Sequence, residues 1–175
     1  MRTTTMRQRI LTALFIGVVI GIIGAIVKFG WEVPFPPRTP LRDLTNPPQQ
    51  LLQQMGVPFD ITHLTYMYNE NARPIVSFIM HFGFSITFGV LYAVVAEYRP
   101  SITLWQGAMY GLVVWIAFHI LIMPALGTVP APWDQPFAEH FSEATGHMFW
   151  AWVMELARRD LRSRITHEPD PAVPV

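Results

Sequence analysis

Three long apolar runs dominate the pattern of hydrophobic and polar positions along the chain. Ile10 to Val27, Pro74 to Ala96 and Ile102 to Gly127 contain no Asp, Glu, Lys or Arg over 18, 23 and 26 residues. An α-helix rises about 1.5 Å per residue, so each run is long enough to cross a hydrocarbon layer of about 30 Å. The sequence therefore predicts membrane-spanning helices close to residues 10–29, 74–96 and 102–126.

A fourth apolar segment is shorter and is flanked by acidic residues. Ala144 to Met154 is uncharged for 11 residues, and extending it to the length of a span takes in glutamates. The arginines favour a span here, because cytoplasmic flanks of membrane helices collect Lys and Arg. They precede the first run and follow this segment, at Arg2, Arg7, Arg9, Arg158, Arg159, Arg162 and Arg164. Both termini are then cytoplasmic, which requires an even number of spans.

The predicted fold is an all-α, polytopic membrane protein with four transmembrane helices. One transmembrane domain covers residues 1–165, with the fourth span at 137–157 and a disordered cytoplasmic tail at 166–175. The alternative has three spans, with residues 136–157 lying as an amphipathic helix on the membrane surface.

Residues 30–73 are expected to form a proline-rich loop on the outer side that contains short helices. Asn46 is followed by two prolines and, further on, by Gly56, which predicts an N-capped short helix with a glycine stop. Apolar residues three or four apart indicate a second short helix over residues 60–71.

The composition agrees with membrane insertion and excludes other classes. Hydrophobic residues make up 51% of the 175 residues and charged residues 14%, whereas soluble domains average about 25% charged residues. The formal net charge is zero, which gives no general attraction for nucleic acid. The lack of Cys excludes disulfides, thiolate metal sites and cysteine nucleophiles. No phosphate-binding glycine loop or Ser-His-Asp motif is evident, so a role other than catalysis is favoured.

Small residues form a ridge along the first span. Ala13, Gly17, Gly21 and Ala25 recur every four residues, so they share one side of a helix. Such a ridge lets another backbone approach closely. The pairing is either within one chain or between two copies in a homo-oligomer.

Ionisable residues from three predicted spans share one depth in the bilayer. His81, His119 and Glu143 each lie six or seven residues inside the outer end of their span, about 10 Å below the outer boundary. On the fourth span His147 lies one turn deeper and Glu139 one turn shallower. These five residues are the candidate functional cluster.

A second pair of charges lies at the outer end of the first span. Lys28 and Glu32 are one helical turn apart, which predicts a rim ion pair close to the cluster. A charged side chain in hydrocarbon costs about 2.5–3.5 kcal/mol on insertion scales. The cluster therefore needs partners or water.

Several interpretations of the cluster stay open. Imidazoles gain their charge at about pH 6.5, so the cluster suits a site that senses or conducts protons as the outer side acidifies. His81, His119 and Glu143 also form a donor set for zinc or another divalent ion, which a small hydrolase would use as well. A b-type haem between His81 and His119 is a further option. In the remaining interpretation the polar groups only hold the helices together.

Three stretches resemble the YagU family of bacterial inner-membrane proteins. They are Lys28 to Arg38, Leu104-Trp-Gln-Gly107 and Arg158 to Pro171. Further matching positions are His81, His119, Glu139, Ser142, Glu143, Gly146 and His147, whereas His140 departs from the family pattern. The resemblance covers nearly the whole chain and implies an inner-membrane location with a link to acid tolerance. It also implies three spans, as members are often described, where the arginines favour four.

Overall fold

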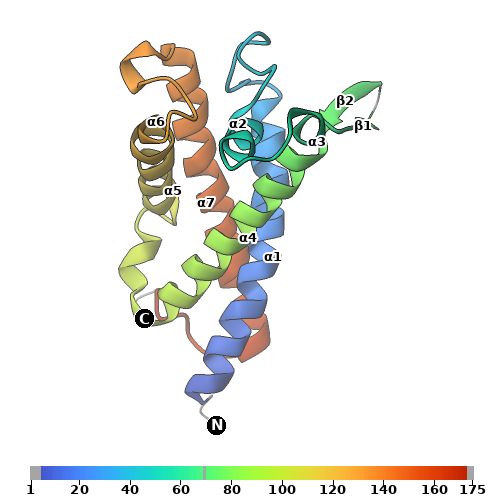
Figure 1. Cartoon of the computed structure of the whole chain (residues 1–175). Coiled ribbons are helices and arrows are strands. Elements are labelled where there is room, and N and C mark those ends of the chain that lie inside the picture. Colours follow the sequence, from blue (N-terminus) through green and yellow to red (C-terminus); the bar gives the residue numbers. More distant parts are fainter. Residues whose placement is uncertain (1–4, 69, 173–175) are drawn as a thin grey trace.

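The structure, a computed structural model, describes residues 5–68 and 70–172 and consists mainly of long helices (Figure 1). Helices α1 (Met6–Glu32) and α4 (Ile75–Tyr98) and the helical stretch Ala108–Ala125 are long and apolar enough to cross a membrane. Both chain termini lie at one end of the bundle, here called the terminal end. The segments that join α1 to α4 and α6 (Met123–Ala125) to α7 (Phe137–Thr166) gather at the opposite end, here called the loop end.

The third of these helices changes its winding along its length. It comprises α5 (Ala108–Trp115), the π-helical segment η2 (Ile116–Ile122) and α6 (Met123–Ala125). A π-helical turn holds one more residue than an α-helical turn, so it shifts the direction in which the side chains point. His119 lies within this segment.

The third helix begins later than the sequence predicts. The expected start at residue 102 is wrong, because a 3₁₀ turn, η1 (Pro100–Thr103), and a tight turn occupy residues 100–107. Trp105, Gln106 and Gly107 all have positive φ, and the Gly107 N–H donates to the Thr103 carbonyl. A Cβ at position 107 would lie 2.7 Å from the Ala151 carbonyl oxygen, so only glycine fits this turn.

The small-residue ridge of α1 packs against α4 within the chain. A Cβ on Gly21 would lie 2.5 Å from the Ile86 Cα, and one on Gly17 would clash with Val90. Ala13 and Ala25, the other members of the ridge, are buried. The Ser85 hydroxyl of α4 donates to the Gly21 carbonyl at 2.6 Å, a contact that this close approach permits.

Helix α7 (Phe137–Thr166) runs along α1 and α5 with its polar side facing inward. Its buried residues include Glu139, Ser142, Glu143, His147, Glu155, Arg158 and Arg162. Between Phe137 and Leu156 its exposed large residues are apolar, namely Phe137, Phe141, Phe149, Trp152 and Leu156, whereas Asp160 and Arg164 are exposed nearer its C-terminal end. The mean hydropathy of α7 is therefore low although the outward surface of residues 137–156 is apolar.

The segment between α1 and α4 contains one predicted helix and one unexpected hairpin. Helix α2 (Pro47–Gln54) begins at Asn46, whose side chain accepts from the Gln49 N–H, and this confirms the predicted capped helix. The helix expected over residues 60–71 is wrong, since only α3 (Phe59–Thr62) is helical. Strands β1 (Thr65–Tyr68) and β2 (Asn71–Pro74) follow as an antiparallel hairpin, favoured by the β-forming Thr and Tyr residues of β1.

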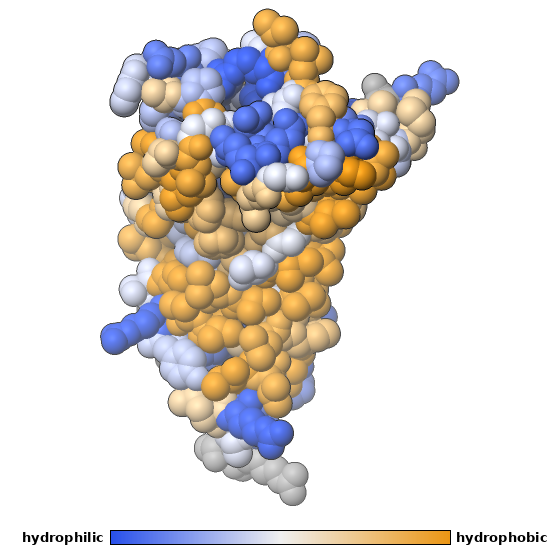
Figure 2. All heavy atoms as spheres, viewed as in Figure 1, coloured by the Kyte–Doolittle hydropathy of each residue, from blue (hydrophilic) through white to orange (hydrophobic). Residues whose placement is uncertain are grey.

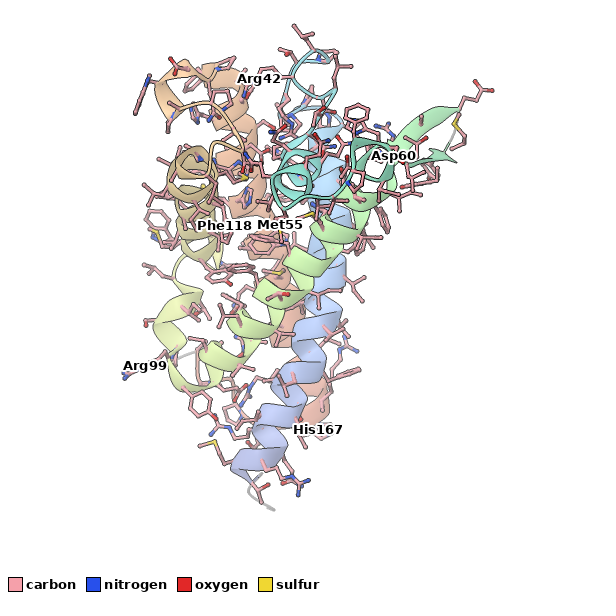
Figure 3. The ribbon with its side chains drawn as sticks, viewed as in Figure 1. Arg42, Met55, Asp60, Arg99, Phe118 and His167 are labelled. Atoms are coloured by element: carbon pink, nitrogen blue, oxygen red, sulfur yellow. The ribbon has the colours of Figure 1, made fainter. Side chains whose placement is uncertain are left out.

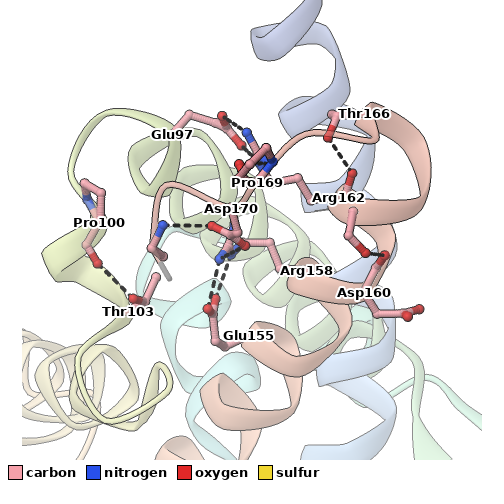
Figure 4. Close-up of polar contacts among 12 residues, drawn as sticks. Glu97, Pro100, Thr103, Glu155, Arg158, Asp160, Arg162, Thr166, Pro169 and Asp170 are labelled. Atoms are coloured by element: carbon pink, nitrogen blue, oxygen red, sulfur yellow. Dashed lines mark hydrogen bonds and ion pairs between the residues drawn. The ribbon is translucent and has the colours of Figure 1, made fainter. Parts of the chain in front are cut away.

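Buried ion pairs close the terminal end of the bundle (Figure 4). Arg158 contacts Glu155 at 2.6 Å, and Arg162 contacts Glu97 of α4 at 2.6 Å. Arg9 of α1 joins the same Glu97 at 2.9 Å. Together with Asp170 and Tyr92, these residues form what is called the terminal network below.

Residues 167–172 fold back onto α7, although the sequence predicts a disordered tail. Asp170 pairs with Arg158 at 2.8 Å, and the carbonyls of Glu168 and Pro169 accept from Arg162. Arg158 and Arg162 are buried, so the tail supplies part of the neutralisation and hydrogen bonding that they need. The expected disorder at 173–175 lies outside the described residues.

Candidate functional site

Glu143 of α7 is the point at which charged and titratable side chains from several segments meet. Its Oε2 lies 3.0 Å from the Lys28 Nζ of α1, and its Oε1 lies 3.2 Å from the Arg38 Nη1. Oε2 also lies 3.7 Å from both the His119 Nε2 of η2 and the His147 Nδ1. These five residues are called the Glu143 cluster.

Two hydrogen bonds and an aromatic stack hold the segment that contains Arg38 against α7. The Ser142 hydroxyl donates to the Phe35 carbonyl at 2.5 Å, and the Trp31 indole N–H donates to the Ser142 carbonyl at 3.1 Å. The rings of Trp31 and Phe35 stack with 4.6 Å between centroids. Arg38 lies three residues beyond Phe35, so these contacts place the Arg38 guanidinium next to Glu143.

Arg38 remains a cation in this environment. Burial lowers the pKa of its guanidinium, but the carboxylates of Glu143 and Asp43 raise it by more, so the pKa lies above its ordinary value. The Arg38 Nε donates to Asp43 at 3.0 Å, which fixes the direction of the guanidinium. Glu143 thus has a permanent partner outside the helices.

The two histidines of the cluster are held in different ways. The His147 Nδ1 lies 2.7 Å from the Glu143 carbonyl oxygen, which only accepts, so this nitrogen carries the hydrogen. The bare nitrogen of a neutral His147 is then Nε2. The rings of His147 and His119 meet edge to face with 4.9 Å between centroids. His119 lies in the π-helical segment η2, and no backbone hydrogen bond to its ring is found among the described residues.

Two further ion pairs lie beside the cluster. Lys28 and Glu32 form the expected pair at 2.7 Å, so Lys28 bridges Glu32 and Glu143. Glu139, one turn from Glu143, pairs with Arg42 at 2.8 Å. The other carboxylate oxygen of Glu139 is buried and has no hydrogen-bond partner in the described part of the chain.

The structure separates His81 from the cluster that the depth argument assigns to it. Its Nε2 lies 3.0 Å from the Ala25 carbonyl, and its ring stacks on Phe29 with 3.9 Å between centroids. Depth along a helix does not fix the direction of a side chain around it. His140, set apart by the sequence, points its Nε2 at the Pro132 carbonyl, 2.8 Å away.

Arg38 and Arg42 are site residues that the sequence analysis did not single out. Both lie in the proline-rich segment, where no periodicity relates them to a helix face. One feature of the sequence did point to Arg38 as a site residue, because it is the last residue of a stretch that resembles the YagU family.

A cavity of about 240 Å³ lies beside the Glu143 cluster. Its polar lining comprises Lys28, Glu32, Arg38, His81, Ser85, His119, Glu143 and His147. The rest is mainly apolar, with Pro47, Pro48, Leu51, Met80, Phe84, Phe118, Ile122, Met123, Leu126 and Trp150. Figure 3 shows Phe118 projecting from the α5 side toward α4, and its ring meets that of Phe84 with 4.8 Å between centroids. His81 and His119 thus share one cavity although they do not share Glu143.

The donor atoms of His119, Glu143 and His147 lie within 4.8 Å of one another, a spacing that a metal ion can bridge. The surrounding charges oppose this use. Lys28 and Arg38 already neutralise Glu143, and a divalent ion would face both cations. His81, the third ligand expected from the sequence, donates its Nε2 hydrogen to Ala25, and this bond also occupies a nitrogen that haem ligation would use.

Comparison with known proteins gives a family and a bacterial relative. A family model described as "Protein of unknown function (DUF1440)" matches residues 22–156. The chain is 37% identical over 196 aligned positions to the inner membrane protein YagU of Escherichia coli strain K12, covering 99% of this chain and 96% of the relative. No solved structure matches the chain.

Proposed function

The chain belongs to the DUF1440 family, and we propose that it is a four-helix inner-membrane protein whose Glu143 cluster responds to protons from the loop end. The observation that carries this proposal is the convergence on one buried carboxylate. Glu143 joins α1 and the proline-rich segment to α7 through two cations, Lys28 and Arg38. It also lies beside His119 of η2 and His147, whose imidazoles are the groups that gain a charge as the pH falls.

The inward polar side of α7 supports a fourth membrane crossing. The helix is 30 residues long, about 45 Å at 1.5 Å per residue, and packs against α1 and α5. Its exposed large side chains between Phe137 and Leu156 are apolar, as expected of a surface in contact with lipid. Figure 2 shows an apolar band around the middle of one face, with hydrophilic residues gathered toward the two ends.

The distribution of basic residues supports cytoplasmic termini. Of the described Lys and Arg residues, seven lie at the terminal end (Arg7, Arg9, Arg99, Arg158, Arg159, Arg162 and Arg164) and four at the loop end (Lys28, Arg38, Arg42 and Arg73). Cytoplasmic flanks are the richer in Lys and Arg.

Cysteine labelling tests this topology in a chain without native cysteines. A membrane-impermeant thiol reagent should modify a Leu41→Cys variant on spheroplasts, and an Arg164→Cys variant only after the membrane is opened. Modification of both from the same side would contradict four crossings.

Proton binding at the cluster is unfavourable in the arrangement observed. The groups that face Glu143 are Lys28 and Glu32 of α1, Arg38, Arg42 and Asp43 of the loop segment, His119 of η2, and Glu139, His140 and His147 of α7, with His81 of α4 across the cavity. A proton on His119 or His147 adds a positive charge next to two fixed cations. A proton on Glu143 removes the charge that both cations share.

The sign of the response follows from linkage. We call the observed arrangement, in which Arg38 contacts Glu143, the closed arrangement. In an open arrangement the loop segment has left Glu143 and the positive charges lie further apart. The open arrangement therefore binds protons more tightly than the closed one. Acidification therefore shifts the population toward the open arrangement. The proposed role is a proton-driven opening at the periplasmic face, in support of acid tolerance.

The accessibility of Ser142 tests the opening, because Phe35 and Trp31 cover it in the closed arrangement. The rate of thiol modification of a Ser142→Cys variant, divided by that of Leu41→Cys at the same pH, corrects for the reactivity of the reagent. This ratio should rise as the loop side is acidified from about pH 7.5 to pH 5 and stay flat when His119→Asn and His147→Asn are added. A flat ratio in the unmodified background would overturn the proposal.

A divalent metal site is a second candidate, favoured by the spacing of the His119, Glu143 and His147 donor atoms. Titration with zinc at neutral pH distinguishes the two. Stoichiometric zinc binding that is lost in His119→Asn and retained in the distant His167→Asn would favour the metal.

A further inference from the structure

We infer that the cavity beside the Glu143 cluster binds a single-chain amphiphile, with its head at the cluster and its hydrocarbon chain between α4 and the α5–α6 helix. The inference goes beyond the proton response, because it requires no residue to change its charge. It rests on the division of the cavity lining into a charged part and an apolar part.

The charged part of the lining favours a head without net charge. Lys28 and Arg38 carry two positive charges, and Glu32 and Glu143 carry two negative charges. A neutral or zwitterionic head leaves this balance intact, whereas an anionic head competes with Glu143 for its cations.

Hydrogen-bonding groups are also free to receive the head. The Arg38 Nη2 donates to no other described residue, and the His81 ring offers its Nδ1 as an acceptor because its Nε2 donates to Ala25. Glu32, paired with Lys28 through Oε1, retains its second carboxylate oxygen. A head that carries both donors and acceptors matches this set.

The apolar part of the lining suits a hydrocarbon chain. Met80, Phe84, Phe118 and Trp150 enclose it with aromatic and thioether surface, and none of them carries a charge. Phe84 and Phe118 meet edge to face across the space between α4 and η2. The volume of about 240 Å³ is below the usual range of about 300–1,000 Å³ for drug-sized pockets, which favours one chain over the two of a phospholipid.

The cavity has a route to the surface of the bundle. Ile122 and Leu126 line it, yet they are 42% and 55% exposed, so its mouth lies beside η2 and α6. Figure 1 shows α4 diverging from α5 toward the loop end. In a membrane-embedded bundle, an amphiphile enters through this gap from the lipid.

Tryptophan fluorescence reports the occupant directly, because Trp150 lines the cavity and Trp152 is exposed two residues further along α7. The probe is a lysophosphatidylethanolamine with a brominated chain, added to detergent-free nanodiscs at neutral pH. Bromine quenches nearby indoles, so a saturable quenching component should appear on a linear background from the bilayer. Trp150→Phe should remove the saturable component, and the matched Trp152→Phe should keep it.

Filling the cavity provides a second test in which the reporter, Trp150, is left in place. The double substitution Met80→Phe with Ile122→Phe narrows the cavity. The control, Ile79→Phe with Leu121→Phe, places two phenyl rings at neighbouring positions that do not line the cavity and are 62% and 60% exposed. The first pair should raise the half-saturating concentration by about tenfold. The second pair should leave it unchanged.

Probes with the same chain and different heads test the head preference. Monoacylglycerol and lysophosphatidylethanolamine should bind more tightly than lysophosphatidylglycerol, which is anionic. Preference for the anionic probe would overturn the assignment of the head. Quenching that never saturates, or that is equal in Trp150→Phe and Trp152→Phe, would overturn the site itself. Either result leaves the pH dependence of Ser142 accessibility to be judged separately.

Discussion

The two ends of the bundle both bury carboxylates against cations, but they use different side chains. The terminal network pairs glutamates with arginines and is completed by Asp170 from the tail. The Glu143 cluster adds a lysine and two histidines and lies beside a cavity. None of the terminal network residues lines that cavity.

This difference distinguishes buried charges that only stabilise the bundle from buried charges that take part in the proposed function. Arg158 pairs with Glu155 and Asp170, and an arginine guanidinium stays protonated at any pH the cell meets. Ion pairs of this kind hold helices together without responding to the surroundings. A free imidazole gains its charge near pH 6.5, so histidines beside a cavity respond to pH when the site around them opens.

The largest expected effect is the loss of a buried counterion in the terminal network. Glu155→Gln leaves Arg158 with Asp170 alone and weakens the hydrogen bond from the Tyr92 hydroxyl. Breaking a buried pair should cost about 3 kcal/mol in the free energy of unfolding. The loss should be the same at neutral and mildly acidic pH when unfolding is followed in nanodiscs. A loss confined to acidic pH would remove the distinction between the two ends.

A smaller effect is expected for Glu143→Gln at the loop end. Lys28 keeps Glu32 and Arg38 keeps Asp43, so each cation retains a partner. The free energy of unfolding at neutral pH should fall by about 1–3 kcal/mol. Below about pH 5 its decline on acidification should become shallower than in the unmodified protein, because the Glu143 carboxylate itself takes up a proton there. An unchanged pH dependence, measured by thermal unfolding over the same pH range, would argue against Glu143 as the centre of the response.

The smallest change in stability is expected for His119→Asn. Its ring lies 3.7 Å from Glu143, beyond hydrogen-bonding distance, so neutral His119 contributes less than about 1 kcal/mol at neutral pH. The stability at acidic pH should rise relative to the unmodified protein, because a destabilising proton site is gone. His167→Asn is the matched control, since His167 lies at the terminal end in a positive-φ conformation that Asn tolerates. Equal pH profiles for both variants would count against the account.

The sequence predicted elements whose pattern is carried by local residues. The apolar runs located α1 and α4, and Asn46 with its prolines located α2. The stripe of Glu139, Glu143 and His147 is buried on α7, as its four-residue spacing indicates. Hydropathy does not mark α7 as a candidate span, because its inward-facing polar residues lower its mean hydropathy.

The remaining features depend on contacts between distant parts of the chain. The turn at Gly107 is set by Ala151, and the order of the tail is set by Arg158 and Arg162. Arg38 reaches Glu143 from a loop segment that Ser142 holds through Phe35. No periodicity along the sequence encodes such pairings, which explains why the arginines and the cavity were not predicted.

The distance between the loop segment and α7 tests the central claim most directly. Spin labels on Leu41→Cys and Phe137→Cys, two exposed positions, report this distance by electron resonance. We predict that the distribution shifts to longer distances as the loop side is acidified from about pH 7.5 to pH 5, and that adding His119→Asn and His147→Asn abolishes the shift. A distribution that is unchanged by pH in the unmodified background, or a shift that survives without both histidines, would contradict the account.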